Sequence, residues 1–532
     1  MNKKENYNVA ALSCTGHEAG VSILRNGEIY EIILEERLSG KKRDNILYYV
    51  FESLKKFHDL HGLDEIILIN GTDGEFDEME DFLEKYKLNE IKRDIEYQEH
   101  HLYHAASGFY ASGFEEAVCI VIDGWGADFR IPELMELAKI ELTDEDTENS
   151  KKWSDIMFLE STSIYDAKYP HDFTPLWKNF IVPAPSPRGF IEVNFPNNFF
   201  EMLTKSEIVD VNSCYDIGIM YGTVTYHLGW VRDECGKTMG LAAYGDHNDN
   251  LPSFILDNGM ANMNVFYSNR LFNTTNFPQL RHDDDFQKKA DLAWEIQDCM
   301  EKVLVMRVQQ VLKMKPETKN IVFSGGCALN ICANSVIQEE FPDINFFIDP
   351  IAGDACQSLG AAKLFHHERT KSEEIKPMNS IYPKDNFLKK VRDLASKNGI
   401  LLIFDEIITG FRFSIGGAQE FFNVTPDLAT IGKGMGNGMP ISAIVGKSKY
   451  MCKMDKIFFS STFGGESLSI KGSIATIKKL IKKNVPKKLY ELGSYLDEGV
   501  SKTLKKYNLE ETITYEGHPC WKIMKVKDRN NI

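Results

Sequence analysis

Three histidines lie within five residues in the stretch Gln98–Tyr110, which reads QEHHLYHAASGFY. His100 and His104 are four residues apart, and on an α-helix this spacing places two side chains on the same face. Two imidazoles on one face can bind a single metal ion. His101 would then point in another direction. An isolated HxxxH pair also occurs as two surface or core histidines, so further ligands are needed to decide between these interpretations.

Two aspartates are candidates for the remaining ligands. Asp123 ends the hydrophobic run in IVIDGWG, and Asp354 follows another hydrophobic run in FFIDPIAGD. In α/β folds, ligands bind at the carboxyl ends of the strands. Two imidazoles and two carboxylates form a nitrogen and oxygen donor set that suits iron(II), manganese or zinc, and does not suit a soft thiolate-binding metal. These residues therefore predict a site for Fe(II) or a similar divalent metal.

A pair of glycines follows a third hydrophobic run, in VFSGGCALN. Gly325 and Gly326 would let phosphate oxygens approach the backbone, and the N-terminus of the helix that follows would attract negative charge. A plain tight turn is the more common use of two glycines. Between a strand and a helix, beside a candidate metal site, the pair favours nucleotide binding.

Alternating strand and helix patterns must position these residues, and they predict an α/β fold. Residues 7–35 contain short β-prone runs with Asn26-Gly27 as a hairpin signal, and residues 290–314 have the apolar spacing of a long helix. Residues 319–341 and 344–367 each read as strand, loop and helix. Residues 128–215 have weak periodicity, and we interpret them as an inserted region on the substrate side.

Length and composition limit the remaining function classes. A chain of 532 residues should form three or four compact units. A net charge of −17 disfavours binding to nucleic acid. Ten cysteines without a CxxC pair favour a reducing, cytoplasmic location. No apolar run approaches the ~20 residues that cross a bilayer, so no membrane association is expected.

Five segments, in this order, resemble the O-carbamoyltransferases that modify nodulation factors, antibiotics and polysaccharides. They are GHEAGVSILRNGEIYEIILEERLSGKKRD, EHHLYHAASGFYASGFEEAVCIVIDGWG, CGKTMGLAAYG, SGGCALNICAN and PIAGDACQSLGAA. The resemblance implies an actin-like ATPase fold with two duplicated lobes over residues 1–375, as in the enzymes that transfer threonylcarbamoyl to tRNA. It also implies transfer of a carbamoyl group from carbamoyl phosphate, through a carbamoyl-adenylate made with ATP as co-substrate, to a hydroxyl of a sugar or other small molecule.

The same resemblance assigns roles to individual residues. The family's metal ligands map onto His100, His104, Asp123 and Asp354. His17 matches a histidine near the transfer site, where an imidazole can accept the proton of the acceptor hydroxyl. Lys42 matches a basic position that could hold a phosphate or the carbamoyl oxygen, although a solvated surface lysine would look the same. The residues that would contact the nucleotide are Gly124, Gly325, Gly326 and Asn330.

From residue 387 the sequence resembles a different family, the class III aminotransferases of the glutamate semialdehyde aminomutase type, which use pyridoxal 5'-phosphate (PLP). The segments that carry this resemblance include LLIFDEIITGFR and DLATIGKGMGNGMPISAIVG. It implies a partial fold-type I PLP-transferase domain over residues 387–532, with 376–386 as the linker. Asp405 would keep the pyridine nitrogen protonated, Lys433 would form the Schiff base with PLP, and Thr462 would bind the cofactor phosphate across a dimer interface.

Parts of both families are not found in the chain. The GPRALG-type motif of the second carbamoyltransferase domain is absent, and so is the earlier half of the aminotransferase sequence. Three hypotheses follow. The chain is a carbamoyltransferase joined to a partial aminotransferase, a PLP aminotransferase completed by another chain, or a non-catalytic binding module. Because both families tend to dimerise, the resemblance also makes a homodimer an expectation.

Overall fold

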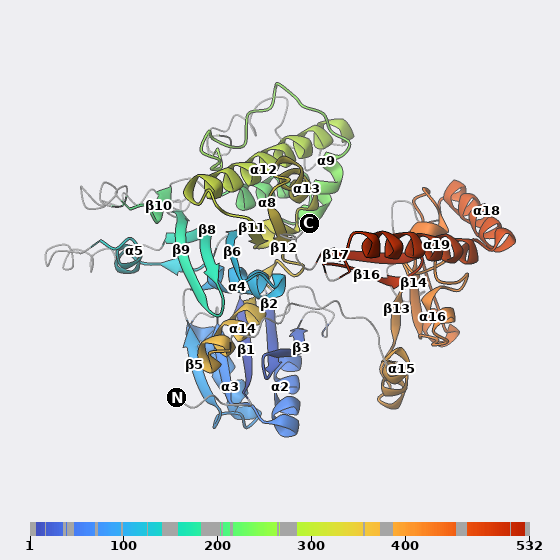
Figure 1. Cartoon of the computed structure of the whole chain (residues 1–532), viewed down its shortest axis with the longest axis horizontal. Helices are drawn as coiled ribbons and strands as arrows, with labels where there is room; N and C mark the ends of the chain where they lie inside the picture. Colours follow the sequence, from blue (N-terminus) through green and yellow to red (C-terminus); the bar gives the residue numbers. More distant parts are fainter. Residues whose placement is uncertain are drawn as a thin grey trace. The chain divides into compact units, whose positions relative to one another are not determined.

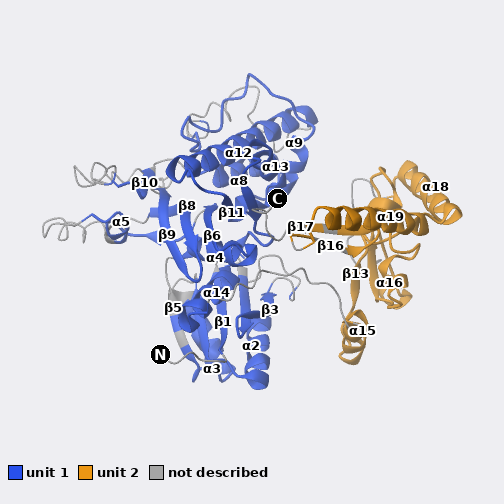
Figure 2. Cartoon of the chain, in the orientation of Figure 1, with its two compact units in different colours: residues 1–379 blue, residues 380–532 orange. Residues whose placement is uncertain are grey.

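A computed structural model of the chain describes residues 7–15, 18–35, 39, 47–69, 73–96, 99–124, 126–140, 158–181, 203, 206–212, 216–262, 265, 285–354, 357–372, 387–453, 465–510 and 512–526. The chain divides into two compact units, residues 1–379 and residues 380–532 (Figure 2). We call them unit 1 and unit 2 and describe each by itself.

The described residues of unit 1 form two sheets (Figure 1). The first has the strand order β3-β2-β1-β4-β5, in which β1, β2 and β3 are antiparallel and β1, β4 and β5 are parallel. The Asn26-Gly27 hairpin signal is confirmed, because both residues have positive φ, 53° and 79°, between β2 and β3. The strands are β1 Asn8–Thr15, β2 Glu18–Arg25, β3 Glu28–Leu34, β4 Glu65–Ile69 and β5 Lys92–Glu96.

Helices cover both faces of the first sheet. Successive side chains of a strand point to opposite faces, and in β1 the side chains on both faces are apolar, so each face packs against helices. Ala10 and Leu12 of β1 pack with α2 (Tyr48–His61) and α3 (Asp73–Lys85). Val9 and Ala11 of the same strand pack with α14 (Gln357–Thr370). The sheet is therefore buried between helices from distant parts of the sequence.

The second sheet has the order β10-β9-β8-β6-β11-β12, with β7 paired to β8. Its centre is parallel where β6, β11 and β12 meet, and β8 is antiparallel to β6. The helices α8 (Ile217–His227), α12 (Phe286–Met314) and α13 (Ile331–Glu340) cover one face, and α4 (His100–Ser112) packs on the other. The strands are β6 Glu116–Ile122, β7 Asp128–Phe129, β8 Phe158–Lys168, β9 Asp172–Ile181, β10 Val209–Asn212, β11 Asn320–Ser324 and β12 Asn345–Ile348.

The interpretation of residues 128–215 as an insertion is wrong for residues 158–181. This segment forms β8 and β9, and β8 pairs with β6 from Thr162 to Lys168 in the middle of the sheet. Most side chains of β8 are buried whichever face they occupy, so the strand lacks the polar and apolar alternation that would identify it in sequence.

Helices α4 and α14 approach each other closely and join the two sheets of unit 1. A Cβ atom at Gly360 of α14 would lie 1.9 Å from the backbone oxygen of Tyr103 in α4. Small residues also let α4 lie close to the second sheet, because Ala105 and Ala106 are buried against it and a Cβ at Gly108 would lie 2.6 Å from the side chain of Val322 in β11. The contact between α4 and α14 brings the N-terminus of α14 to the histidines of α4.

Unit 2 has a smaller sheet, β13-β14-β15, and a separate hairpin of β16 and β17. Strands β13 and β14 are parallel, and β15 is antiparallel to β14. The elements of unit 2 are α15 Phe387–Lys397, β13 Ile403–Asp405, α16 Gly417–Phe421, β14 Leu428–Ile431, η5 Lys433–Met435, β15 Ala443–Gly446, α17 Ser448–Met451, α18 Ser467–Lys483, α19 Val485–Lys506, β16 Ile513–His518 and β17 Trp521–Val526.

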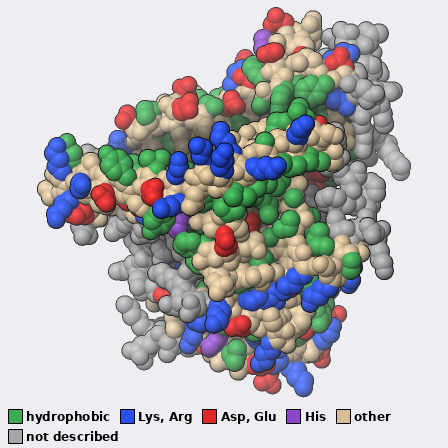
Figure 3. Space-filling view, turned by 90° about the vertical axis from the view of Figure 1, so that its right-hand side faces the viewer, with side chains coloured by type: hydrophobic (Ala, Val, Ile, Leu, Met, Phe, Trp, Pro, Cys, Tyr) green, Lys and Arg blue, Asp and Glu red, His purple; other side chains and the backbone are tan. Residues whose placement is uncertain are grey.

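The described part of unit 2 buries few apolar side chains, and these are Ala395, Val424, Pro426, Ala429, Met435 and Pro486. Large apolar residues are instead exposed on its helices and strands, for example Ile403, Leu468 and Tyr495, which is 74% exposed. Figure 3 shows apolar side chains at many places between the lysines and arginines of the face it draws.

The structure confirms the expected mixed α/β class. Within the described ranges, no helix combines the length and apolar character needed to cross a bilayer.

Candidate functional site

Helix α4 presents His100 and His104 on the same face. His100 is the first residue of the helix, and Gly113 ends it in the left-handed conformation with φ of 75°. The small residues of α4 allow it to pack against both α14 and the second sheet, so its first turn is enclosed. His104 is fully buried and His100 is 8% exposed.

Two loops bring carboxylates to these histidines. Asp123 follows β6 directly. The sequence suggested that Asp354 stands at the end of a strand. In the structure this strand, β12, ends at Ile348, so the carboxylate that follows it directly is Asp349, and Asp354 lies five residues farther on. The turn from Asp349 to Asp354 carries the second carboxylate back toward α4.

Asp349 holds this turn in place. Its Oδ2 accepts a hydrogen bond of 3.0 Å from the Ser324 hydroxyl of β11, and its Oδ1 accepts one of 3.0 Å from the backbone N–H of Ile351. Burial raises the pKa of Asp349, and the hydrogen bonds oppose that rise. Sequence reasoning missed this residue, although it stands immediately after the apolar run FFI.

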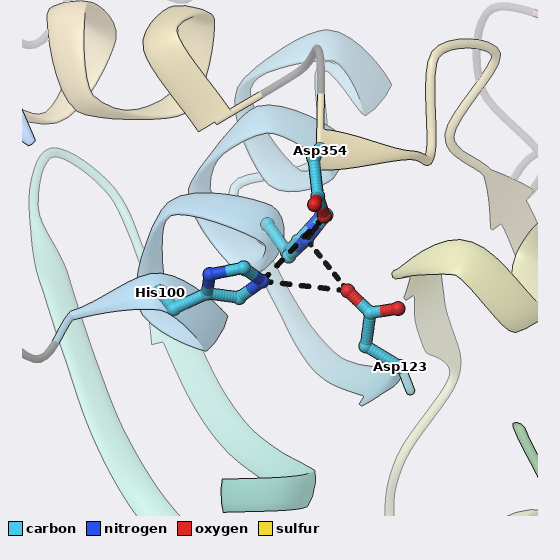
Figure 4. Close-up of side chains that lie close together, drawn as sticks. His100, Asp123 and Asp354 are labelled. Carbon is cyan, nitrogen blue, oxygen red and sulfur yellow. Dashed lines mark hydrogen bonds and ion pairs between the residues drawn. The ribbon is translucent and has the colours of Figure 1, made fainter. Parts of the chain in front are cut away.

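The four side chains predicted as metal ligands converge on one point (Figure 4). One ligand atom from each of His100, His104, Asp123 and Asp354 lies within 4.8 Å of all the others. Nε2 of His104 is 3.3 Å from Oδ2 of Asp123 and 3.4 Å from Oδ1 of Asp354. Nε2 of His100 is 3.4 Å and 3.6 Å from the same two oxygens.

The electrostatics of this cluster favour an anionic Asp123. Burial opposes ionisation of this carboxyl, but hydrogen bonds and positive charge from His100 and His104 hold its pKa well below the usual range. The side chain of Asp123 is 15% exposed and that of Asp354 is 22% exposed. The site therefore opens on its carboxylate side, and its histidine side is closed.

Gln357, the first residue of α14, is a further member of the cluster that sequence reasoning missed. It is fully buried, and its amide nitrogen lies 2.9 Å from Nε2 of His100 and 3.1 Å from Nε2 of His104. The same nitrogen donates to Oδ1 of Asp354 at 3.0 Å. Its position three residues after Asp354 is the signal that could have identified it.

The loop that begins with Gly325 and Gly326 and ends at Asn330, here called the glycine loop, lies against Asp123. A Cβ at Gly326 would lie 2.8 Å from Oδ1 of Asp123, and one at Gly325, whose φ is 89°, would lie 2.5 Å from the backbone oxygen of Ile122. Larger residues would therefore push the loop away from the cluster. Gly124 is different, because a Cβ there would meet no atom within 4 Å.

Asn330 fixes the far end of the glycine loop. Its side-chain oxygen accepts a hydrogen bond of 3.0 Å from the backbone N–H of Ala333 and so caps α13. Its amide also exchanges two hydrogen bonds with Gln297 of α12, at 2.9 and 3.1 Å. In this structure the Asn330 side chain supports the loop.

A buried polar network lies behind the cluster and includes His101, the third histidine. Nδ1 of His101 is 2.9 Å from the hydroxyl of Ser163, which donates to Oε1 of Glu160 at 2.7 Å. The ammonium of Lys178 donates to the same oxygen at 2.7 Å. Burial lowers the pKa of His101 to about 3. This histidine points into the second sheet, away from the convergence point.

Three predicted site residues, His17, Lys42 and Thr462, lie outside the described residues. In unit 2, Asp405 and Lys433 come at the carboxyl ends of the neighbouring parallel strands β13 and β14. Asp405 accepts hydrogen bonds from the Ile407 backbone at 2.9 Å and from the Thr430 hydroxyl at 3.2 Å. Asp405 and Lys433 are both exposed.

Comparison with known families places a boundary between residues 363 and 378, close to the boundary between unit 1 and unit 2. The profile of the family described as Carbamoyltransferase N-terminus matches residues 65–363, and that of Aminotransferase class-III matches residues 378–524. Residues in the second part are similar to glutamate-1-semialdehyde 2,1-aminomutases. Identity is 46% over 130 residues with the Methanosphaera stadtmanae protein, covering 24% of this chain and 30% of that protein. It is 50% over 103 residues with the Methanocaldococcus jannaschii protein, covering 19% and 24%.

The chain thus spans less than a third of the length of these two curated relatives. Among solved structures, full-length HypF in a phosphate- and nucleotide-bound form is 12% identical, with a TM-score of 0.39 over 68% of this chain and 56% of that chain. An acetylornithine aminotransferase from Elizabethkingia anophelis is 27% identical, with a TM-score of 0.26 over 27% of this chain and 36% of that chain.

Proposed function

We propose that residues 1–375 transfer a carbamoyl group to a hydroxyl of a sugar or other small molecule. The premise is that the chain belongs to the carbamoyltransferase family, whose N-terminal profile matches residues 65–363. The group would come from carbamoyl phosphate and be activated with ATP as a carbamoyl-adenylate. An actin-like ATPase arrangement of residues 1–375 is part of this proposal. The observation that carries it is the convergence of four ligand side chains beside a glycine loop.

The donor set of the cluster fits a divalent cation such as Fe(II). Two imidazole nitrogens and two carboxylate oxygens are donors that Fe(II), Mn(II) and Zn(II) accept, and His100, His104, Asp123 and Asp354 would hold the ion. When bound, the cation would supply Lewis acidity that polarises a carbamoyl or phosphate oxygen. Asp123 favours binding because it is already anionic at neutral pH, so no proton has to be removed from it.

The glycine loop would hold the phosphates of the nucleotide. Backbone N–H groups at Gly325 and Gly326 and the N-terminus of α13 attract anions. Because Gly326 abuts Asp123, a phosphate bound there would lie beside the cation. Gly124 leaves open space at the same edge, and Asn330 would keep the loop in position through its cap and its bonds to Gln297.

In the transfer step a bond forms between the acceptor oxygen and the carbamoyl carbon. The bond from that carbon to the adenylate phosphate oxygen breaks, and AMP leaves. The acceptor hydroxyl must lose its proton, and we propose His17 as the base that takes it. Lys42 would hold a phosphate or the carbamoyl oxygen. Both assignments rest on the sequence resemblance.

Metal content tests the proposed centre. The purified chain, prepared without oxygen, is expected to bind one Fe(II) per chain, and the double variant His100→Ala/His104→Ala is expected to lose it. The matched control, His61→Ala/His247→Ala, removes two histidines outside the cluster and should keep the metal. Unchanged metal content in the first variant would remove the proposal.

A transfer assay then tests the activity. Carbamoyl-adenylate and candidate hydroxyl acceptors are supplied to the metal-loaded chain, and release of AMP with a carbamoylated acceptor is measured. We expect His17→Ala to reduce transfer by about 10²–10⁴-fold while retaining the metal, since a general base contributes a factor of that size. Binding of ATP and metal without transfer to any acceptor would instead identify the chain as a binding module.

A second candidate function is PLP binding by unit 2. The supporting observation is the placement of Asp405 and Lys433 after neighbouring parallel strands, within a segment that matches the class III aminotransferase profile. Asp405 would bind the pyridine nitrogen and Lys433 would bind the cofactor covalently, and bound PLP would act as an electron sink. Because both side chains are exposed, we propose that another chain completes the site.

Absorbance of PLP linked to the protein tests this second function. Titration of PLP into the chain should produce the visible band of a lysine-bound cofactor, and Lys433→Ala should abolish it. Lys482→Ala, an exposed lysine of α18, is the control and should leave the band unchanged. A band of equal intensity in Lys433→Ala would contradict the assignment.

A further inference from the structure

Gln357 lies at the point where the four candidate ligands meet. It is the first residue of α14, and its side chain is completely buried. Its amide nitrogen lies between 2.9 and 3.1 Å from Nε2 of His100, Nε2 of His104 and Oδ1 of Asp354. One polar atom is therefore close to three of the four ligand atoms at once.

An amide nitrogen does not match these three neighbours. If Nε2 of each histidine donates its proton to Asp123, this nitrogen faces two N–H groups and only one acceptor, Oδ1 of Asp354. Its N–H groups would also face a cation held by the same atoms. Rotation of the amide by 180° about its last bond exchanges nitrogen and oxygen with almost no change in shape. After that rotation a carbonyl oxygen, which is a metal ligand, would point at the site.

We propose that Gln357 is a fifth ligand of the metal centre and binds the cation through Oε1. This inference rests on the metal centre of the proposed function and deepens it. In the metal-free protein the side chain of Gln357 lies between the imidazoles and Asp354, and with a cation bound its Oε1 would face the ion. The ligand set would then comprise two neutral imidazoles, two carboxylates and one neutral carbonyl, whose net charge balances a divalent cation.

The alternative role for Gln357 is hydrogen-bond donation alone, in which its nitrogen positions Asp354 and the histidines whether or not a metal is present. The two roles predict opposite effects of the substitution Gln357→Glu on metal binding. An ionised glutamate offers oxygen atoms and no donor. Gln357→Glu therefore keeps a ligand atom if Gln357 binds the metal, and loses the essential group if Gln357 only donates.

The experiment uses Co(II) alone as the probe with the full chain. Its dissociation constant is measured by competition with a chelator, and its visible absorption spectrum reports the number of ligands. We expect Gln357→Leu to weaken Co(II) binding by at least about tenfold and to change the spectrum. Gln357→Glu should retain tight binding. The control Asn179→Leu removes another fully buried amide, which bonds to Ser161, and should alter neither measurement.

Two results would overturn this role. One is a Gln357→Leu variant with the affinity and spectrum of the wild type, and the other is a Gln357→Glu variant that binds as weakly as Gln357→Leu. Both leave the proposed metal centre intact. Failure of the wild-type chain to bind Co(II) would instead overturn the metal centre itself, so the two failures are distinguishable.

Discussion

At the scale of single residues, charge in unit 1 is controlled by buried neighbours. Asp123 is anionic because two histidines offset the cost of its burial. Glu160 behaves similarly, because burial opposes its ionisation while His101, Lys178 and Ser163 favour it and lower its pKa to about 2. One carboxylate serves the candidate site, and the other lies within the sheet behind it.

The lowered pKa of Glu160 predicts a dependence of stability on pH. The unfolded value is near 4.5, so the stabilisation from the ionised form is complete above that pH and is lost as pH falls toward 2. Thermal unfolding of the metal-free chain should show a midpoint that decreases between pH 5 and pH 3. We expect Glu160→Gln to start from a lower midpoint at pH 7 and to decrease less.

Glu339→Gln is the control for this measurement, because Glu339 is exposed on α13. Its midpoint should follow that of the wild type at every pH. Equal slopes for the wild type and Glu160→Gln below pH 5 would contradict the assigned role of Glu160.

At the scale of elements, the contact between α4 and α14 assembles the candidate site. The helix with His100 and His104 and the helix that begins at Gln357 come from segments more than 240 residues apart. Gly360 lets them meet, because any side chain there would overlap the backbone of Tyr103. The geometry of the candidate metal site therefore depends on a residue that does not touch it.

Gly360→Ala should separate these helices. The new Cβ would lie 1.9 Å from a backbone oxygen, and overpacking of this kind typically costs about 1–3 kcal/mol of unfolding free energy. Urea denaturation measures that loss. We also expect weaker Co(II) binding, because Gln357 and Asp354 would move away from the histidines.

Gly240→Ala is the matched control in helix α9 (Cys235–Ala242). A Cβ at Gly240 would meet no atom within 4 Å, so replacing glycine in this helix should stabilise by about 0.5–1 kcal/mol. If Gly360→Ala were as stable as Gly240→Ala, close helix packing would not be what positions the site.

At the scale of the whole molecule, the two units differ in how much apolar surface they bury. The five clusters of buried apolar side chains in the described ranges all belong to unit 1. Unit 2 has short strands, and apolar residues such as Ile403 and Val445 are exposed on β13 and β15, the edges of its sheet. Exposed edges of this kind pair readily with other chains, which agrees with a second function that needs a partner.

Amide hydrogen exchange should be faster in unit 2 than in unit 1. Few buried apolar contacts imply local opening at low free energy, so amides of β13, β14 and β15 should exchange much faster than those of β1 and β6. Exchange measured by mass spectrometry tests this expectation, and equal protection of the two sets would contradict it. Addition of Co(II) should slow exchange in α4 and leave that of unit 2 unchanged.

The sequence alone determined the features that depend on local pattern. Helical spacing identified the α4 histidines, and apolar runs located β6, β11 and β12 beside Asp123 and the glycine pair. Family motifs indicated a change of family at residues 376–386, and the two family profiles end and begin nearby, at residues 363 and 378. These signals survive in sequence because each depends on residues near one another in the chain.

Only the tertiary structure decided the features that depend on long-range packing. It placed β8 at the centre of a sheet, because a strand buried on both faces has no alternation to read. It also brought Gln357 and Asp349 to the cluster through the contact of α14 with α4 and the turn after β12. Their roles arise from neighbours that are distant in the chain, and the local signals alone, an aspartate after a strand and a glutamine three residues after Asp354, do not reveal those neighbours.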